Sequence, residues 1–145
     1  LKSVIEMNQQ QPSMTVELIE EALGELAGKR IALLGLAFKP GTDDVRNSPS
    51  LTIIRDLIRR GAMVLAHDPI AIASMQRNFI SPSLRYCEDL SDAVRGVDAL
   101  VLVTAWPEYS DLHRMAELQD TPVIDGRRFL NKENFKCYHG VGLRN

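Results

Sequence analysis

The sequence predicts an α/β domain in which helices cover both faces of a doubly wound, parallel β-sheet. Three observations lead to this prediction. Short, uniformly apolar runs recur along the chain, as expected of strands that are buried on both faces. Amphipathic segments with hydrophobic residues at three- and four-residue steps separate these runs, and this spacing favours helices. The alternation of strand and helix implies parallel pairing through right-handed crossovers.

The composition is that of a globular domain with one core. The chain has 145 residues, of which 45% are hydrophobic and 25% charged, and its formal net charge is −2. This length suits one domain, and the weak negative charge argues against a nucleic-acid partner. No apolar run is long enough for a membrane span, and residues 1–12 lack the apolar centre of a signal peptide. We therefore expect no nucleic-acid or membrane partner. The chain has only two cysteines and no CxxC pair, so we expect a reducing, cytoplasmic environment.

Two helices are predicted before the first strand. Residues 1–11 form the tail of the first helix, which Pro12 should end because proline cannot donate a backbone hydrogen bond. Hydrophobic residues recur at helical spacing over residues 16–26 and mark the second helix, which Gly28 ends. Because the chain begins inside a helical pattern and without methionine, we expect it to be part of a longer protein.

Strands and helices then alternate to the end of the chain. Ser48 and Pro49 should open the helix after the first strand, since the missing N–H of proline is harmless in the first turn. The expected strands are residues 31–36, 63–67, 84–87, 99–103, 123–124 and 135–141. The expected helices between them are residues 48–60, 70–76, 90–94 and 111–118.

The longest connection, residues 35–50, follows the first strand and reads Gly-Leu-Ala-Phe-Lys-Pro-Gly-Thr-Asp-Asp-Val-Arg-Asn-Ser-Pro-Ser. The usual dinucleotide loop, Gly-x-Gly-x-x-Gly, runs directly into a helix. Here only the first glycine of that motif, Gly35, is present, and Pro40 prevents a helix from continuing through this point. We therefore expect a projecting loop that presents Phe38, Lys39 and Arg46, in place of a tight pyrophosphate cradle.

These residue types suit a nucleotide diphosphate. Lys39 offers a mobile charge and Arg46 a planar fork that holds phosphate through two hydrogen bonds, while Phe38 can pack against a sugar or base. Asp43 and Asp44 would repel phosphate, so they should cap backbone N–H groups or pair with Arg46 and set its direction. A surface loop of solvated charges explains the same residues without a ligand.

The expected topology brings further polar residues to this loop. With the strand order 3-2-1-4-5, the fifth strand lies roughly 10 Å from the first. Lys39, Thr104 and Arg127 then share the carboxyl edge of the sheet, where open α/β sheets bind ligands. Arg127 could instead form a salt bridge with Asp125 or Asp68, and Thr104 could be a turn or N-cap residue.

The run at residues 35–50 resembles the signature of nucleotide-sugar dehydrogenases, the family of UDP-glucose and GDP-mannose dehydrogenases. Residues 101–109 and 124–128 resemble the UDP-glucose branch more than the GDP-mannose branch. The resemblance implies a C-terminal, nucleotide-sugar-binding Rossmann-like domain at residues 12–145. It also implies that residues 1–11 end a central helix that forms the dimer of the full-length protein.

The resemblance further implies an activity. NAD would be bound mainly by an N-terminal domain of the same chain, outside this sequence, and the UDP-sugar by the present domain. The enzyme would oxidise the C6 alcohol of the sugar in two hydride transfers, with UDP-glucose as the expected substrate. Carried over by position, Phe38 and Lys39 contact the nucleotide sugar, Arg127 contacts its ribose or diphosphate, and Arg46 reaches the NAD phosphates. Thr104 remains a candidate substrate contact on the edge geometry.

No catalytic or metal-binding residue is expected in this chain. The family's nucleophile is a cysteine in a Gly-Gly-Ser/Cys-Cys-Phe/Leu-Pro-Lys-Asp context, and neither Cys87 nor Cys137 lies in one. The chain alone is therefore predicted to be inactive. His67, His113 and His139 lie outside the motif positions, and we interpret them as structural.

Three other functions are possible for an α/β domain of this size. The chain could be a stand-alone nucleotide- or NAD-binding module without catalysis, or a domain of a GDP-mannose or UDP-N-acetylmannosamine dehydrogenase. A receiver domain would need paired acids directly after the first strand and a phosphoacceptor aspartate after the third. Asp43 and Asp44 come too late, and Cys87-Glu88 occupies the second position.

Overall fold

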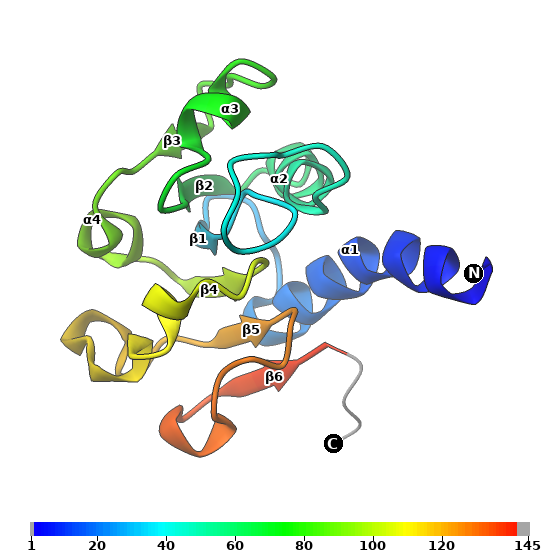
Figure 1. The fold of residues 1–145 in the computed structure, drawn as a ribbon. Coiled ribbons are helices and arrows are strands. Elements are labelled where there is room, and N and C mark those ends of the chain that lie inside the picture. Colours follow the sequence, from blue (N-terminus) through cyan, green and yellow to red (C-terminus); the bar gives the residue numbers. More distant parts are fainter. Residues whose placement is uncertain (1, 142–145) are drawn as a thin grey trace.

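The computed structural model describes residues 2–141 and, from residue 12 onward, their side chains. Within this part of the chain, strands and helices alternate as expected (Figure 1). The strands are β1 (Arg30–Leu34), β2 (Met63–His67), β3 (Leu84–Tyr86), β4 (Ala99–Leu102), β5 (Val123–Asp125) and β6 (Tyr138–Gly140). The α-helices are α1 (Lys2–Leu23), α2 (Ser50–Arg59), α3 (Ile72–Gln76) and α4 (Leu90–Val94). The 3-10 turns are η1 (Pro107–Tyr109), η2 (Leu112–Arg114), η3 (Ala116–Leu118) and η4 (Lys132–Asn134).

The sheet has the strand order β3-β2-β1-β4-β5-β6, and every neighbouring pair is parallel. This confirms the doubly wound fold and the order of its first five strands, with β6 added beside β5. The direction of winding reverses between β1 and β4, where such sheets bind ligands. Helices α1 and α2 cover one face, and α4 with η1 to η3 covers the other (Figure 1).

The core lies between the central strands and the helices. Every residue of β4 is fully buried, and so are Ile31, Leu33 and Leu34 of β1. Ile54 of α2 and Ile19 of α1 are also fully buried and belong to the same cluster. Because the central strands are covered on both faces, they read as continuous apolar runs without alternation, which is why they could be located in the sequence.

The prediction that Pro12 ends a helix is wrong, because α1 runs without interruption from Lys2 to Leu23. Proline inside a helix costs about 3 kcal/mol. Packing of an amphipathic face outweighs this cost, since tertiary contacts supply most of the stability of a helix in a protein. Pro12, Val16 and Ile19 are all buried along α1. The two helices expected before β1 are therefore one helix.

The single helix expected at residues 111–118 is also wrong. The chain forms two separate 3-10 turns, η2 and η3, and Met115 between them has an extended ψ of 124°. A continuous α-helix would place Leu112 and Leu118 about 120° apart around its axis. The break at Met115 lets both leucines be buried in the core instead.

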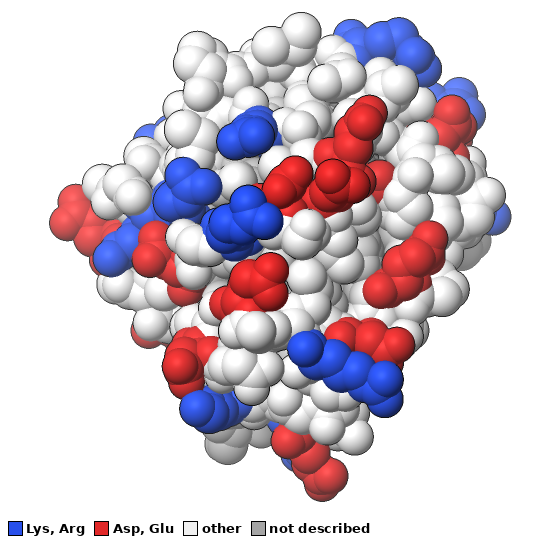
Figure 2. All heavy atoms as spheres, turned by 90° about the vertical axis from the view of Figure 1, so that its left-hand side faces the viewer, with Lys and Arg blue, Asp and Glu red and all other residues white. Residues whose placement is uncertain are grey.

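The charges on one face and the character of the helices bear on whether the described part of the chain suits a nucleic-acid or membrane partner. On the face that carries α4 and the 3-10 turns, acidic and basic side chains are interspersed (Figure 2). Neither sign of charge covers this face, so it lacks the continuous basic field typical of a nucleic-acid surface. Among the residues that the structure describes, no helix combines the length and the apolar character needed to cross a membrane.

Candidate functional site

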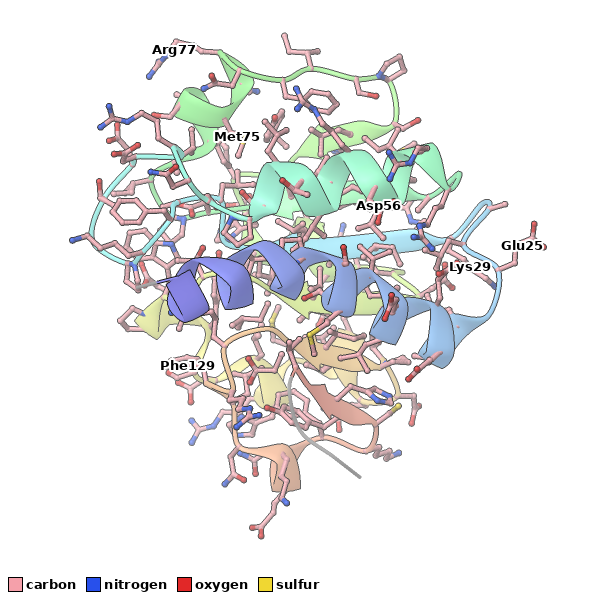
Figure 3. All side chains as sticks on the ribbon, turned by 90° about the vertical axis from the view of Figure 1, so that its right-hand side faces the viewer. Glu25, Lys29, Asp56, Met75, Arg77 and Phe129 are labelled. Atoms are coloured by element: carbon pink, nitrogen blue, oxygen red, sulfur yellow. The ribbon has the colours of Figure 1, made fainter. Side chains whose placement is uncertain are left out.

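The carboxyl ends of β1, β4 and β5 meet at one edge of the sheet, and all the predicted site residues lie in the loops that follow them. Residues 35–49 connect β1 to α2. Seen from the face that α1 and α2 cover, this loop lies at the same end of the molecule as Phe129, whereas Glu25 and Lys29 lie at the opposite end (Figure 3). The structure therefore brings the loops after β1 and β5 to a common edge.

Gly35 lets the loop leave β1 directly above β4. Its φ of +102° lies in the region that favours glycine, and a Cβ placed there would lie 2.4 Å from the Cβ of Thr104. The side chain of Thr104 is buried beneath the loop, and its hydroxyl donates a hydrogen bond of 2.5 Å to the carbonyl of Ala37. Thr104 thus supports the loop, and its predicted contact with the diphosphate stays a prediction.

The start of α2 is hydrogen-bonded back to the beginning of the loop. The hydroxyl of Ser50 donates to the carbonyl of Leu36 at 3.1 Å, and the hydroxyl of Ser48 accepts from the N–H of Ser50 at 3.2 Å. The helix begins at Ser50, two residues after the expected position, although Pro49 already has helical angles of −70° and −10°. Assigned helix ends commonly differ by this much.

Phe38 and Lys39 project from the middle of the loop. The N–H of Phe38 donates to the carbonyl of Asp44 at 3.0 Å, which closes the segment between them. Phe38 is 40% exposed, and the ammonium of Lys39 lies 5.4 Å from the centroid of its ring, a cation–π distance. The pair presents an apolar face and a mobile positive charge to solvent.

Asp44 pairs with Arg46, as the sequence analysis expected. Nε and Nη2 of Arg46 donate to the two carboxylate oxygens at 3.0 and 2.9 Å, and the backbone N–H of Arg46 donates to Oδ1 at 2.9 Å. These hydrogen bonds lower the pKa of Asp44 and raise the pKa of Arg46. The Arg46 side chain is still 85% exposed, so the pairing orients the guanidinium without covering it.

Asp125 organises the turn that carries Arg127. Its fully buried carboxylate accepts from the N–H groups of Arg127 at 3.0 Å and Leu130 at 2.7 Å, and from the hydroxyl of Tyr138 at 2.8 Å. These bonds involve only the backbone of Arg127. Its exposed guanidinium forms no ion pair with any residue that the structure describes, so the alternative salt bridge to Asp125 or Asp68 is wrong.

A small hollow beside Arg127 lies between the loops at the sheet edge and helices α1 and α2. It is lined by Thr15 of α1, by Pro49 and Ile53 at the start of α2, and by Val103 and Gly126 after β4 and β5. Arg127 therefore lies beside the N-terminus of α2, where the unpaired N–H groups of a helix favour negative charge. A ligand with a diphosphate could contact both.

A buried polar cluster beside the loop was not predicted from the sequence. Asp68, directly after β2, accepts from the indole N–H of Trp106 at 3.0 Å. Nδ1 of His67 lies 2.8 Å from the hydroxyl of Tyr109, which also donates to the carbonyl of His67 at 3.2 Å. The only signal in the sequence was the occurrence of His67 and Asp68 at the end of an apolar run, since their partners lie about 40 residues further along the chain.

The two cysteines lie next to different strands, Cys87 directly after β3 and Cys137 directly before β6. Cys87 is buried, and burial raises the pKa of its thiol, which makes it a poor nucleophile. Cys137 is half-buried just before β6, and its Sγ lies 3.4 Å from Nε2 of His139. Cys137 is therefore at the amino edge of the sheet, opposite the loop.

The burial of His67 predicts a dependence of stability on pH. Burial lowers the pKa of His67 below its ordinary value of 6.5. Between that value and the lower folded value, the unfolded chain binds the proton and the folded chain does not. The free energy of unfolding should therefore fall as the pH drops from about 7 to about 5. Urea unfolding across this range measures the effect.

One variant isolates the contribution of His67. His67→Gln should flatten the dependence of the unfolding free energy on pH in this range. An equally steep fall in the His67 variant would contradict the prediction.

The sheet is parallel and doubly wound, and Lys39 and Arg127 in the loops at its carboxyl edge form no ion pair with any described residue. These features define a nucleotide-binding α/β domain. Residues 32–132 match the model of the UDP-glucose/GDP-mannose dehydrogenase family, UDP binding domain. The chain belongs to this family.

Three relatives illustrate the similarity. UDP-glucose 6-dehydrogenase of Rickettsia conorii is 39% identical over 152 residues, which cover 99% of this chain and 35% of the relative. The structure of a UDP-glucose dehydrogenase from Pyrobaculum islandicum superposes with a TM-score of 0.85 at 38% identity, covering 99% of this chain and 32% of that one. A UDP-D-ManNAc dehydrogenase from Pyrococcus horikoshii gives a TM-score of 0.73 at 28% identity, covering 92% and 31%. The chain thus spans about a third of the length of these relatives.

Proposed function

We propose that this domain holds the nucleotide part of a UDP-sugar for an NAD-dependent oxidation of the sugar's C6 alcohol, with UDP-glucose as the substrate. One observation carries the proposal: the ammonium of Lys39 and the guanidinium of Arg127 project from loops at the same sheet edge. Within the described part of the chain, neither forms an ion pair. A diphosphate would supply the negatively charged partner for both side chains.

Each residue has a distinct part in the proposed site. Arg127 can hold phosphate oxygens through its planar fork, whereas Lys39 acts as a mobile charge. Phe38 packs its exposed ring against the sugar or the base. Thr104 acts from below, where its hydrogen bond to Ala37 fixes the start of this segment.

Arg46 is proposed to reach the phosphates of NAD. Its exposed guanidinium is aimed by Asp44 and suits an anionic group, and NAD would accept the hydride when bound. The loop itself does not provide a dinucleotide cradle, because it keeps only the first glycine of that motif. NAD would therefore be held mainly by an N-terminal domain of the same longer enzyme.

We propose the same longer enzyme as the source of the catalytic cysteine, so the present chain alone would be inactive. The active protein would be a cytoplasmic homodimer around a central helix. Residues 1–11 would belong to that helix and residues 12–145 to the nucleotide-sugar domain, with α1 running from one into the other. The likeness to the two UDP-glucose dehydrogenases supports this substrate over the other nucleotide sugars, because their identity to this chain is higher than that of the UDP-D-ManNAc enzyme.

The diphosphate site predicts the effect of two substitutions on UDP binding. Lys39→Ala and Arg127→Ala should each weaken the affinity of the chain for UDP by about 1–3 kcal/mol, the range for a charge-assisted hydrogen bond. Isothermal titration calorimetry measures the change. Lys136→Ala is the control, because Lys136 pairs with Asp120 at 2.8 Å and precedes β6 at the opposite edge of the sheet. Unchanged affinity in both site variants would refute the proposed site.

The same calorimetry separates the proposed function from its alternatives. Tighter binding of UDP than of GDP or NAD is the expected result. Tighter binding of NAD would favour a stand-alone cofactor module, and tighter binding of GDP would favour a GDP-mannose dehydrogenase domain.

A further inference from the structure

Asp68 holds the loop after β1 from the side opposite Thr104. Its side chain is buried, and Oδ2 accepts from the backbone N–H groups of Leu36 at 2.7 Å and Ala37 at 3.0 Å. The peptide groups of Ala37 are thus bonded on both sides, its N–H to Asp68 and its carbonyl to Thr104. Phe38 is the next residue, so these bonds set where the exposed part of the loop begins.

The neighbouring strands explain how Asp68 reaches this segment. Leu34, the last residue of β1, is in register with His67, the last residue of β2. The residues that follow each strand therefore lie side by side at the carboxyl edge. In a dinucleotide-binding domain, an acidic residue near this point binds the ribose hydroxyls of the cofactor. Here backbone N–H groups of the chain's own loop occupy the carboxylate.

The other carboxylate oxygen fixes Asp68 itself. Oδ1 accepts from the N–H groups of Ile70 at 2.9 Å and Ala71 at 2.8 Å, which anchors the side chain to the turn between β2 and α3. Together with the indole of Trp106, five N–H donors surround this carboxylate. Hydrogen bonds to a charged acceptor are roughly twice as strong as neutral ones.

We infer that Asp68 is the positioning residue of the nucleotide-sugar site: it occupies the place of a ribose-binding acid but fastens the loop that presents Phe38 and Lys39. The inference rests on the proposed function for its effect on ligand binding. The fastening of the loop is a separate property that can be measured without any ligand.

Asp68→Ser is the most selective variant. A serine hydroxyl can still accept from the N–H groups two and three residues further on, as in an ST turn, but it is too short to reach the loop. Asp98→Ser is the matched control, because Asp98 accepts a backbone hydrogen bond of 2.8 Å from Arg30 at the opposite edge of the sheet. Both substitutions remove a carboxylate that binds backbone.

Hydrogen exchange of individual amides tests the fastening directly. In Asp68→Ser, the amides of Leu36 and Ala37 should exchange about tenfold faster relative to those of Ala32 and Leu33 in β1. Asp98→Ser should leave this ratio unchanged. An equal acceleration of loop and strand amides in Asp68→Ser would show a purely global effect and overturn the inference.

Asp68→Asn provides a second variant if the serine variant does not fold. The amide keeps the shape of the side chain, but its single neutral oxygen cannot replace both carboxylate oxygens. The Leu36 and Ala37 amides should again lose protection relative to β1, by a smaller factor. No relative loss of protection would overturn the inference.

A double-mutant cycle tests the consequence for binding. Asp68→Ser should weaken UDP binding about tenfold, and combining it with Lys39→Ala should weaken binding by less than the product of the two single effects. An effect equal to the product would show that Asp68 does not act through this loop and would overturn the inference. If the unaltered chain binds no UDP, the proposed function fails, and hydrogen exchange alone decides the role of Asp68.

Discussion

Gly35→Ala is expected to lower the free energy of unfolding by about 2–6 kcal/mol, from backbone strain together with overpacking. The φ of +102° is unfavourable for alanine, and the added Cβ would lie 2.4 Å from both the Cβ and the backbone nitrogen of Thr104. Backbone atoms cannot swing aside as the end of a long side chain can. The collision would therefore push apart the loop after β1 and the end of β4.

Gly41→Ala in the same loop is the matched control. Gly41 also has a positive φ, +89°, but a Cβ there would meet nothing within 4 Å. The loss of stability for Gly35→Ala should exceed that for Gly41→Ala by about 1–3 kcal/mol, the usual range for overpacking. Urea unfolding followed by the fluorescence of Trp106 measures both. Equal losses would contradict the proposed contact between the loop and Thr104.

Asp125→Ala is expected to lower the free energy of unfolding by about 3–6 kcal/mol. Each buried donor left without an acceptor costs about 1–3 kcal/mol, and the cost is at the lower end for the two partly buried donors because water reaches them. The substitution leaves three donors unpaired: the N–H groups of Arg127 and Leu130 and the hydroxyl of Tyr138. Among the described residues, no buried side-chain nitrogen or oxygen atom lacks a hydrogen-bond partner, so the variant would introduce a defect that the native fold avoids. Chemical denaturation measures the loss.

Tyr138→Phe is the control for Asp125→Ala, because it removes one partner of the carboxylate and leaves the carboxylate in place. It removes one donor and leaves Asp125 bonded to two N–H groups, so the expected loss is only about 1 kcal/mol. The affinity for UDP should fall in Asp125→Ala, since the turn that carries Arg127 loses its anchor, and should stay unchanged in Tyr138→Phe. A similar effect of both variants on stability would show that Asp125 does not organise this turn.

The parts that could be predicted from the sequence depend on neighbours along the chain. The central strands were found because burial on both faces requires a continuous apolar run. The pairing of Asp44 with Arg46 was expected correctly because the two residues are only two positions apart, and the bond forms within one turn. The departure of the loop from a dinucleotide motif was visible in the glycines that it lacks.

The errors occurred where long-range packing outweighs local preference. Pro12 should end a helix, but burial of α1 against the sheet keeps it continuous. The hydrophobic residues at 111–118 favoured a helix, but the core accommodates Leu112 and Leu118 only when the chain breaks at Met115. In both segments a local energy of a few kcal/mol competes with the packing of a whole element.

Residue types and their spacing were sufficient to predict the doubly wound sheet, the projecting loop and the cations Lys39 and Arg127 at its edge. The supports of that loop became visible only in the folded chain. Thr104 and Asp68 reach Ala37 across 67 and 31 residues, and both contacts exist because β4 and β2 are the neighbours of β1. Hydrogen bonds of this kind depend on which strands pair and in which register, and a linear pattern of residues does not contain that information.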